Sequence, residues 1–171
     1  DFAPVPNAFR GGSWSYTLDP AAELPDIVIS EIVAINRESL RLLTRDEDGE
    51  YSDWIEIHNP SESSENLDGW YLTDDALNLT KWQFPSVSLD RGEFLLVFAS
   101  GKDRAVAGSQ LHTNFKLGKE GEFLALVEPD GQSIAHAFSP AFPEQFGDIS
   151  YGLSADGSTT GYFLTPTPGA R

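Results

Sequence analysis

The side chains most able to do chemistry lie in an acidic loop that spans residues 46–53. Carboxylate oxygens gathered around a glycine turn are the ligands that Ca²⁺ requires. Asp46, Asp48 and Asp53 are therefore the candidate metal ligands, and apart from calcium we expect no cofactor. The loop is not an EF-hand, because its glycine is the fourth residue instead of the sixth. In addition, Ile57 occupies the twelfth position, where a bidentate glutamate is needed.

A solvated acidic loop is the alternative interpretation of the same residues. In it Asp48-Gly49 turns the chain and Asp53 anchors the start of the next strand. A second acidic pair, Asp74-Asp75, could share an ion with this loop only if folding brought both to one edge of the molecule.

Two glutamates, Glu31 and Glu56, interrupt apolar strand patterns. Paired carboxylates about 5 to 10 Å apart can hydrolyse glycosides. On a β-sandwich, however, acids at such positions more often accept backbone amides and hold adjacent loops. We therefore predict structural roles and no catalytic residues. Trp82, which follows Lys81, is the candidate for an exposed ring that could stack on a sugar.

Other catalytic patterns are missing from the sequence. His58, His112 and His136 stand alone on different expected strands or loops, which favours hydrogen-bonded strand histidines over a zinc site. There is no cysteine, and no Gly-x-Ser-x-Gly elbow presents a serine nucleophile. The segment 99–103 contains Gly-Lys but lacks the rest of a phosphate-binding loop. The sequence therefore predicts a protein that is not an enzyme.

The elements that position these residues have a β pattern. Residues 53–59 alternate, with Ile55 and Ile57 on one face and Trp54 and His58 on the other. Four Asp-Gly pairs supply tight turns, and the segment 37–43 is interpreted as loop in preference to helix. Many short strands at regular spacing indicate an all-β sandwich or barrel. The expected strands are 27–35, 53–59, 70–73, 82–84, 94–99, 123–127, 134–138, 149–151 and 162–164.

The two ends differ in composition from the middle. Residues 1–25 are rich in proline and aromatic residues and are predicted to be a flanking linker or an edge segment. Residues 26–164 form the expected domain, and residues 165–171 form a Thr/Pro linker. Because the chain begins with Asp1, we expect a processed product or a piece of a longer protein.

Charge limits the partners. Eleven basic against twenty-seven acidic residues give a net charge of -16, which repels phosphate backbones and anionic lipid, so we expect no nucleic-acid partner. No apolar run reaches the roughly 18 residues that span a bilayer, so we expect no membrane insertion.

Several segments together resemble a lamin-tail domain of the bacterial, extracellular kind, over about residues 26–152. They are ISEIVA (29–34), DGEYSDWIEIHNPS (48–61), NLDGWYLTDD (66–75), KWQFPSVSLDRGEFLLVFASGKDR (81–104), LHTNFKLGKEGEFLALVEPDG (111–131) and DISYG (148–152). The resemblance implies an immunoglobulin-like β-sandwich, in agreement with the strand pattern. It also implies a non-catalytic module of a long exported protein, located outside the cell or at its surface.

From the resemblance we expect an interaction or spacer module. Its partners would be other domains of the same polypeptide, or cell-surface proteins and polysaccharides. Animal lamin tails contact chromatin, but the charge of -16 argues against carrying that property over. A calcium-dependent adhesion or carbohydrate-binding domain is the alternative hypothesis.

Overall fold

The computed structural model describes residues 27–37 and 45–169, and the statements below concern these residues. The flanking segment 1–25 lies outside them, as does all of the segment 37–43 except its first residue. None of the described residues belongs to a helix long and apolar enough to cross a membrane.

The described residues form strands and no helix. The strands are β1 (Val28–Val33), β2 (Asp53–His58), β3 (Glu65–Asn66), β4 (Tyr71–Thr73), β5 (Trp82–Gln83), β6 (Ser88–Leu89), β7 (Phe94–Ala99), β8 (Leu111–His112), β9 (Leu124–Val127), β10 (Ile134–Phe138), β11 (Ser150–Leu153) and β12 (Thr160–Phe163).

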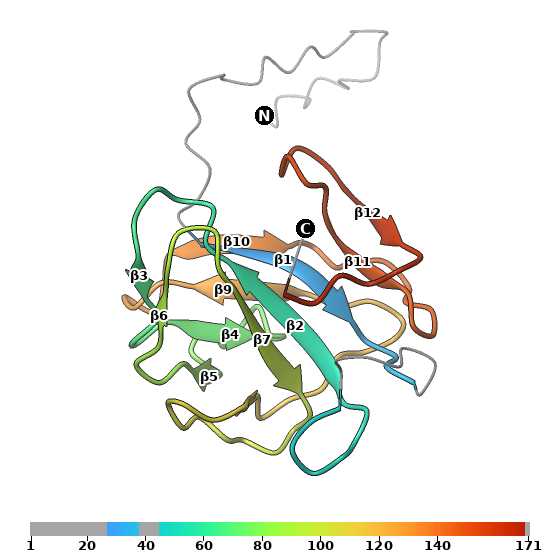
Figure 1. Ribbon diagram of the computed structural model, residues 1–171, viewed down its shortest axis with the longest axis horizontal. Helices are drawn as coiled ribbons and strands as arrows, with labels where there is room; N and C mark the ends of the chain where they lie inside the picture. Colours follow the sequence, from blue (N-terminus) through green and yellow to red (C-terminus); the bar gives the residue numbers. More distant parts are fainter. Residues whose placement is uncertain (1–26, 38–44, 170–171) are drawn as a thin grey trace, which may run out of the picture.

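Two main sheets form an immunoglobulin-like sandwich (Figure 1). The larger sheet has the order β12-β11-β1-β2-β7-β8, and its pairs are antiparallel except for β7 and β8. The smaller sheet has the order β10-β9-β4-β5, and β3 and β6 pair separately. The prediction of an all-β sandwich is confirmed.

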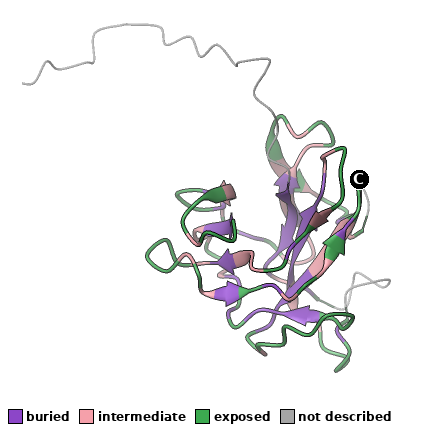
Figure 2. Ribbon diagram, turned by 90° about the vertical axis from the view of Figure 1, so that its left-hand side faces the viewer, coloured by how far each residue is buried: buried purple, intermediate pink, exposed green. Residues whose placement is uncertain are grey.

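The main hydrophobic core includes side chains from both sheets. Figure 2 shows the buried residues concentrated in the strands and the exposed residues in the loops. The larger sheet contributes Ile29, Ile32, Ile55, Ile57 and Val97, and the smaller sheet contributes Leu72, Trp82, Leu124 and Leu126.

The opposite face of the larger sheet is also buried. Trp54 is 0%, Glu56 1% and His58 7% exposed, although all three alternate with the core isoleucines of β2. Trp54 packs with Val33 and Phe98 in a second, smaller cluster. The alternation within β2 is therefore confirmed, but it does not separate a solvent-exposed face from a buried one, because both faces are buried.

The expected strands are all present: 94–99 and 134–138 have the predicted ends, and the others have ends displaced by one or two residues. The strands that sequence analysis missed are β3, β6 and β8, each of two residues, which is too short for a period of two to be visible. The Asp-Gly turns are confirmed as well, because Gly49, Gly69, Gly131 and Gly157 all have φ between 69° and 81°.

Candidate functional site

The two strand glutamates lie side by side because β1 contains a bulge. Ile29 pairs with Ile57, but the register shifts at the next residue, so that Glu31 pairs with Glu56. In a regular strand without the bulge, Glu31 would share the core face with Ile29, because side chains two residues apart point the same way. The bulge therefore places both carboxylates on the outer face of the larger sheet.

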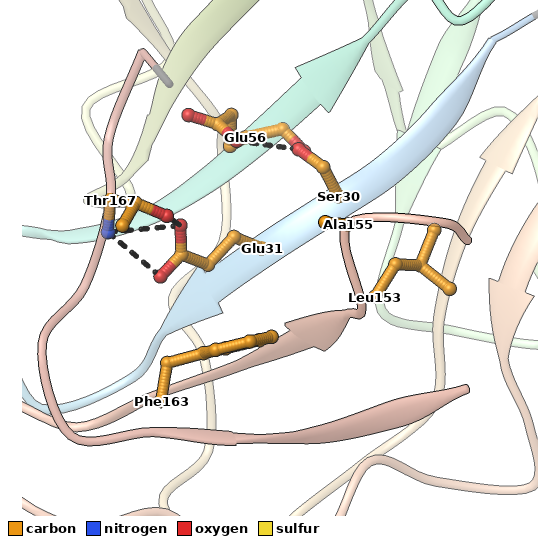
Figure 3. A pocket seen from close by; sticks show the side chains of 7 residues that line it. All are labelled: Ser30, Glu31, Glu56, Leu153, Ala155, Phe163 and Thr167. Atoms are coloured by element: carbon orange, nitrogen blue, oxygen red, sulfur yellow. Dashed lines mark hydrogen bonds between the residues drawn. The ribbon is translucent and has the colours of Figure 1, made fainter. Parts of the chain in front are cut away.

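These two carboxylates bind the C-terminal segment of the described chain. Figure 3 shows the bonds of Glu31 to Thr167 and of Glu56 to Ser30. Thr167 donates its backbone N–H to Oε1 of Glu31 at 3.1 Å and its hydroxyl to Oε2 at 2.9 Å. Gly169 donates its backbone N–H to Oε2 of Glu56 at 2.5 Å. The hydroxyl of Ser30 donates to Oε1 of Glu56 at 2.6 Å, and that of Ser150 donates to Oε1 of Glu31.

Each carboxylate oxygen of the pair therefore accepts a hydrogen bond from the chain itself. Glu31 and Glu56 are 3% and 1% exposed. A cavity of about 160 Å³ beside them is lined by Ser30, Glu31, Glu56, Leu153, Ala155, Phe163 and Thr167. It is smaller than the several hundred Å³ of an ordinary ligand pocket. The prediction that these acids hold adjacent loops by accepting backbone amides is confirmed.

We name residues 165–169 the C-terminal strap, because they lie across the outer face of β1 and β2 (Figure 1). The composition of this segment predicts a linker, but up to Gly169 it belongs to the hydrogen-bond network of the domain.

The acidic loop is organised by a lysine from a distant segment. Oδ1 of Asp46 accepts the backbone N–H groups of Asp48 and Glu50, at 3.1 and 2.9 Å. The ammonium of Lys102 lies 2.6 Å from Oδ2 of Asp46, 2.7 Å from Oδ2 of Asp48 and 3.0 Å from Oε2 of Glu50. The place that a metal ion would take among these acids is therefore held by Lys102.

The electrostatics of Asp46 follow from this contact. Its side chain is 0% exposed, and burial alone would raise its pKa. The hydrogen bonds from Lys102, from the amide of Glu50 and from Ser52 outweigh burial and lower the pKa to about 2. Burial alone would lower the pKa of Lys102, but its hydrogen bonds to the carboxylates of Asp46, Asp48 and Glu50 outweigh burial and raise it.

Asp53 does not join Asp46 and Asp48. Its side chain is largely buried at the start of β2, and burial raises its pKa to about 7, while the backbone amides of Asn36 and Leu117 act in the opposite direction. No group of three or more His, Asp or Glu side chains in the described part of the chain could hold a metal ion. The three predicted ligands therefore do not form one ligand set.

The second acidic pair has partners of its own. Asp74 forms an ion pair with Lys81 at 2.6 Å, and Asp75 accepts the backbone N–H of Leu77 at 2.9 Å. These contacts use both acids within the turn that follows β4.

A serine, a histidine and a glutamate come together where the acidic loop meets β7 and β8. Nδ1 of His112 is 2.8 Å from the hydroxyl of Ser100, and Nε2 is 2.9 Å from Oε2 of Glu47. These contacts resemble the chain of hydrogen bonds in a nucleophilic triad. His112 is 0% and Ser100 8% exposed, however, and the ring of His112 stacks on Phe98.

The burial of this constellation gives it a structural role: it fastens the acidic loop to the larger sheet. A further ion pair strengthens the attachment, since Arg104 lies 2.7 Å from Oε1 of Glu47. Sequence reasoning missed the constellation because Glu47 and His112 are separated by 65 residues. No spacing in the sequence indicates such a contact.

The expectation that Trp82 presents an exposed ring is wrong. Its side chain points into the sandwich from β5 and is 2% exposed, packed edge-to-face on Phe84 with ring centroids 4.9 Å apart. An open hollow of about 520 Å³ lies beside it, lined in part by Tyr71, Gln83 and Asn114. Because Trp82 faces the core, its ring cannot stack on a sugar.

The fold and the use of the acidic residues define an immunoglobulin-like β-sandwich domain whose clustered charges hold its own loops and strap. The family model described as Lamin Tail Domain matches residues 20–139, so the chain belongs to this family of non-catalytic immunoglobulin-like domains. A search of curated proteins found no match.

Proposed function

We propose that the chain is an interaction and spacer module of a larger exported protein, working outside the cell or at its surface. It would connect neighbouring domains of one polypeptide, or a domain and a surface polymer, and it would catalyse no reaction. The likeness of its motifs to bacterial extracellular lamin-tail domains supports the location.

The observation that carries the proposal is the attachment of the strap. Buried carboxylates hold Thr167 and Gly169 against the larger sheet, so the chain reaches residue 169 in a defined position on the domain. A spacer needs such an attachment, because a flexible exit would not transmit the orientation of one domain to the next.

The use of the charged clusters supports the absence of catalysis. A general acid or base must reach a substrate atom, whereas Glu31, Glu56 and His112 are all 3% exposed or less and bonded to the chain itself. Side chains in these positions stabilise the fold without meeting a substrate.

Amide hydrogen exchange measured by NMR tests the attachment. We expect the amides of Thr167 and Gly169 to be protected in the folded domain, since both donate to buried acceptors. Glu31→Gln should reduce protection at Thr167 more than at Gly169, and Glu56→Gln should do the reverse. Glu120→Gln is the matched control, because this side chain is 75% exposed and far along the chain from the strap.

Two results would contradict the proposal. Exchange at Thr167 and Gly169 as fast as in an unstructured peptide would show that the strap is loose. The second is turnover of substrates in a broad hydrolase panel. If Glu31→Gln or Glu56→Gln abolished that turnover while the fold was retained, these glutamates would be catalytic.

A further inference from the structure

The outer edge of β12 is an open sheet edge. β12 ends the larger sheet, and among the described strands only β11 pairs with it (Figure 1). The backbone N–H of Ser154 donates to the carbonyl of Thr159 at 2.8 Å, so Thr159, Gly161 and Phe163 bond to β11. Hydrogen bonds alternate along an antiparallel strand, so the backbone groups of Thr160 and Tyr162 face outward.

The other three edges of the two main sheets are protected. On β8, the backbone of His112 exchanges two hydrogen bonds of 2.9 Å with Arg104. β5 is only two residues long, and the side-chain amide of Asn114 occupies the carbonyl of Lys81 just before it. β10 contains a register irregularity between Ile134 and His136. Short strands, bulges and covered edges are the usual means of preventing strand addition.

Within residues 27–37 and 45–169, β12 has none of these protections. Its four residues pair with β11 without a register shift. The segment 159–165 contains no charged residue and no proline, whereas charged residues and proline are common guards of an edge. The described residues therefore leave the outer backbone groups of β12 unpaired, as an added strand requires.

Apolar side chains lie beside this edge. Phe146 is 48%, Tyr162 43% and Leu164 82% exposed, which are among the largest exposures of apolar side chains in the described residues. Tyr162 contacts Phe146 and Tyr151, with ring centroids 5.7 and 5.3 Å apart, and so links the exposed side chains to the core. An added strand would gain main-chain hydrogen bonds from β12 and apolar contact from these rings.

Charge identifies the kind of partner. The chain carries -16, which disfavours the approach of a second copy. Glu144 adjoins Tyr162, whose hydroxyl donates to the Glu144 carbonyl at 2.5 Å, and Asp156 lies in the hairpin that joins β11 to β12. Hydrogen bonds from Ser154 and Ser158 lower the pKa of Asp156 to about 2, so it is ionised at neutral pH.

We propose that the free edge of β12 binds an extended segment of a cationic protein, which adds to the larger sheet as a seventh strand. The segment would have apolar side chains that meet Tyr162 and Leu164, and basic residues attracted by Glu144 and Asp156. This inference names the contact surface of the interaction module and rests on the proposed function.

An NMR titration with a synthetic peptide tests the inference. The probe has a lysine at each end and alternating valine and threonine between them, with the amide nitrogens of one edge methylated to prevent self-association. We expect changes in the amide signals of Thr160, Tyr162 and Leu164. Leu164→Lys should weaken binding by about tenfold or more, because it removes an apolar contact and repels the lysines.

Two controls separate strand addition from general attraction. Leu77→Lys, at a side chain that is 97% exposed in the turn after β4, should leave binding unchanged. The same peptide methylated along both edges should not bind, because it can no longer pair with a strand.

Several results would overturn the inference. They are signal changes confined to another surface, equal binding of the doubly methylated peptide, no binding at millimolar peptide, and self-association of the chain that Leu164→Lys abolishes. The last would make a second copy the occupant of the edge. Each of these can occur while Thr167 and Gly169 stay protected from exchange, so the spacer function could stand without this surface.

Discussion

Asp53→Asn is expected to make the free energy of unfolding less sensitive to a rise in pH. Burial at the start of β2 raises the pKa of Asp53 from 3.8 to about 7, against the opposing effect of nearby amides and of Lys116. Because this pKa is higher in the folded than in the unfolded state, the folded chain holds an extra proton over that interval. The resulting stability is fully present below pH 3.8 and is lost as the pH rises through about 7.

The magnitude follows from the size of the interval. Each pH unit over which the folded state alone holds the proton changes the free energy of unfolding by about 1.4 kcal/mol. Between about pH 5 and pH 8.5 the unmodified chain should therefore lose about 3 kcal/mol that Asp53→Asn does not lose. The asparagine forfeits one acceptor oxygen, at a cost of about 1 kcal/mol. This cost is the same at each pH, so it cancels from the comparison.

Urea unfolding followed by tryptophan fluorescence at about pH 5, 7 and 8.5 measures the effect. Asp90→Asn is the matched control, because it makes the same chemical change at an exposed acid after β6. Its stability should follow that of the unmodified chain across the range. Parallel stability curves for Asp53→Asn and the unmodified chain would refute the assignment of a buried, titrating carboxyl at this position.

Three further perturbations have defined outcomes. Gly152→Ala should lower the free energy of unfolding in urea by about 2 to 4 kcal/mol, because the added Cβ would lie 2.1 Å from the carbonyl oxygen of Ser30 in the β1 bulge. Gly161→Ala is the control, because the space around its Cβ is open. Equal losses in the two variants would contradict the close approach at Gly152. Lys102→Met should cost about 2 kcal/mol at pH 6, because it leaves the buried Asp46 without its cation. Since the pKa of Asp46 is lowered to about 2, this loss of stability should be present above pH 3.8 and fade as the pH falls through about 2. A loss of the same size below about pH 2 would show that Lys102 stabilises the fold by packing instead of by charge. Millimolar Ca²⁺ should leave the melting temperature unchanged, because the ammonium of Lys102 already occupies the position between Asp46 and Asp48. A clear rise would restore calcium as the ligand of the loop.

Local features of the fold were predictable from the sequence. Alternating isoleucines identify β2, and the Asp-Gly pairs identify turns, because both patterns depend on the preferences of neighbouring residues. The sequence also predicted the type of role that Glu31 and Glu56 have, which is to accept hydrogen bonds from the chain. A carboxylate in an apolar strand must find donors when it is buried, and backbone amides are the most abundant donors.

Contacts between distant segments were not predictable. The sequence places Asp46 and Asp48 in one loop but does not indicate that Lys102, 56 residues after Asp46, supplies their cation. The exposure of Trp82 was predicted wrongly for a related reason. Its neighbour Lys81 suggested a solvent-exposed position, whereas pairing of β5 with β4 directs the indole into the core.

The sequence alone determined that this chain forms a sandwich of short strands with tight turns, since those choices are made within a few residues. Tertiary structure decided which acids are buried and what binds them. The bulge in β1 turns Glu31 beside Glu56, and the strap returns across the sheet to meet both. Such a meeting depends on register and on the path of the whole chain, because a shift of one residue in a strand moves every side chain to the opposite face.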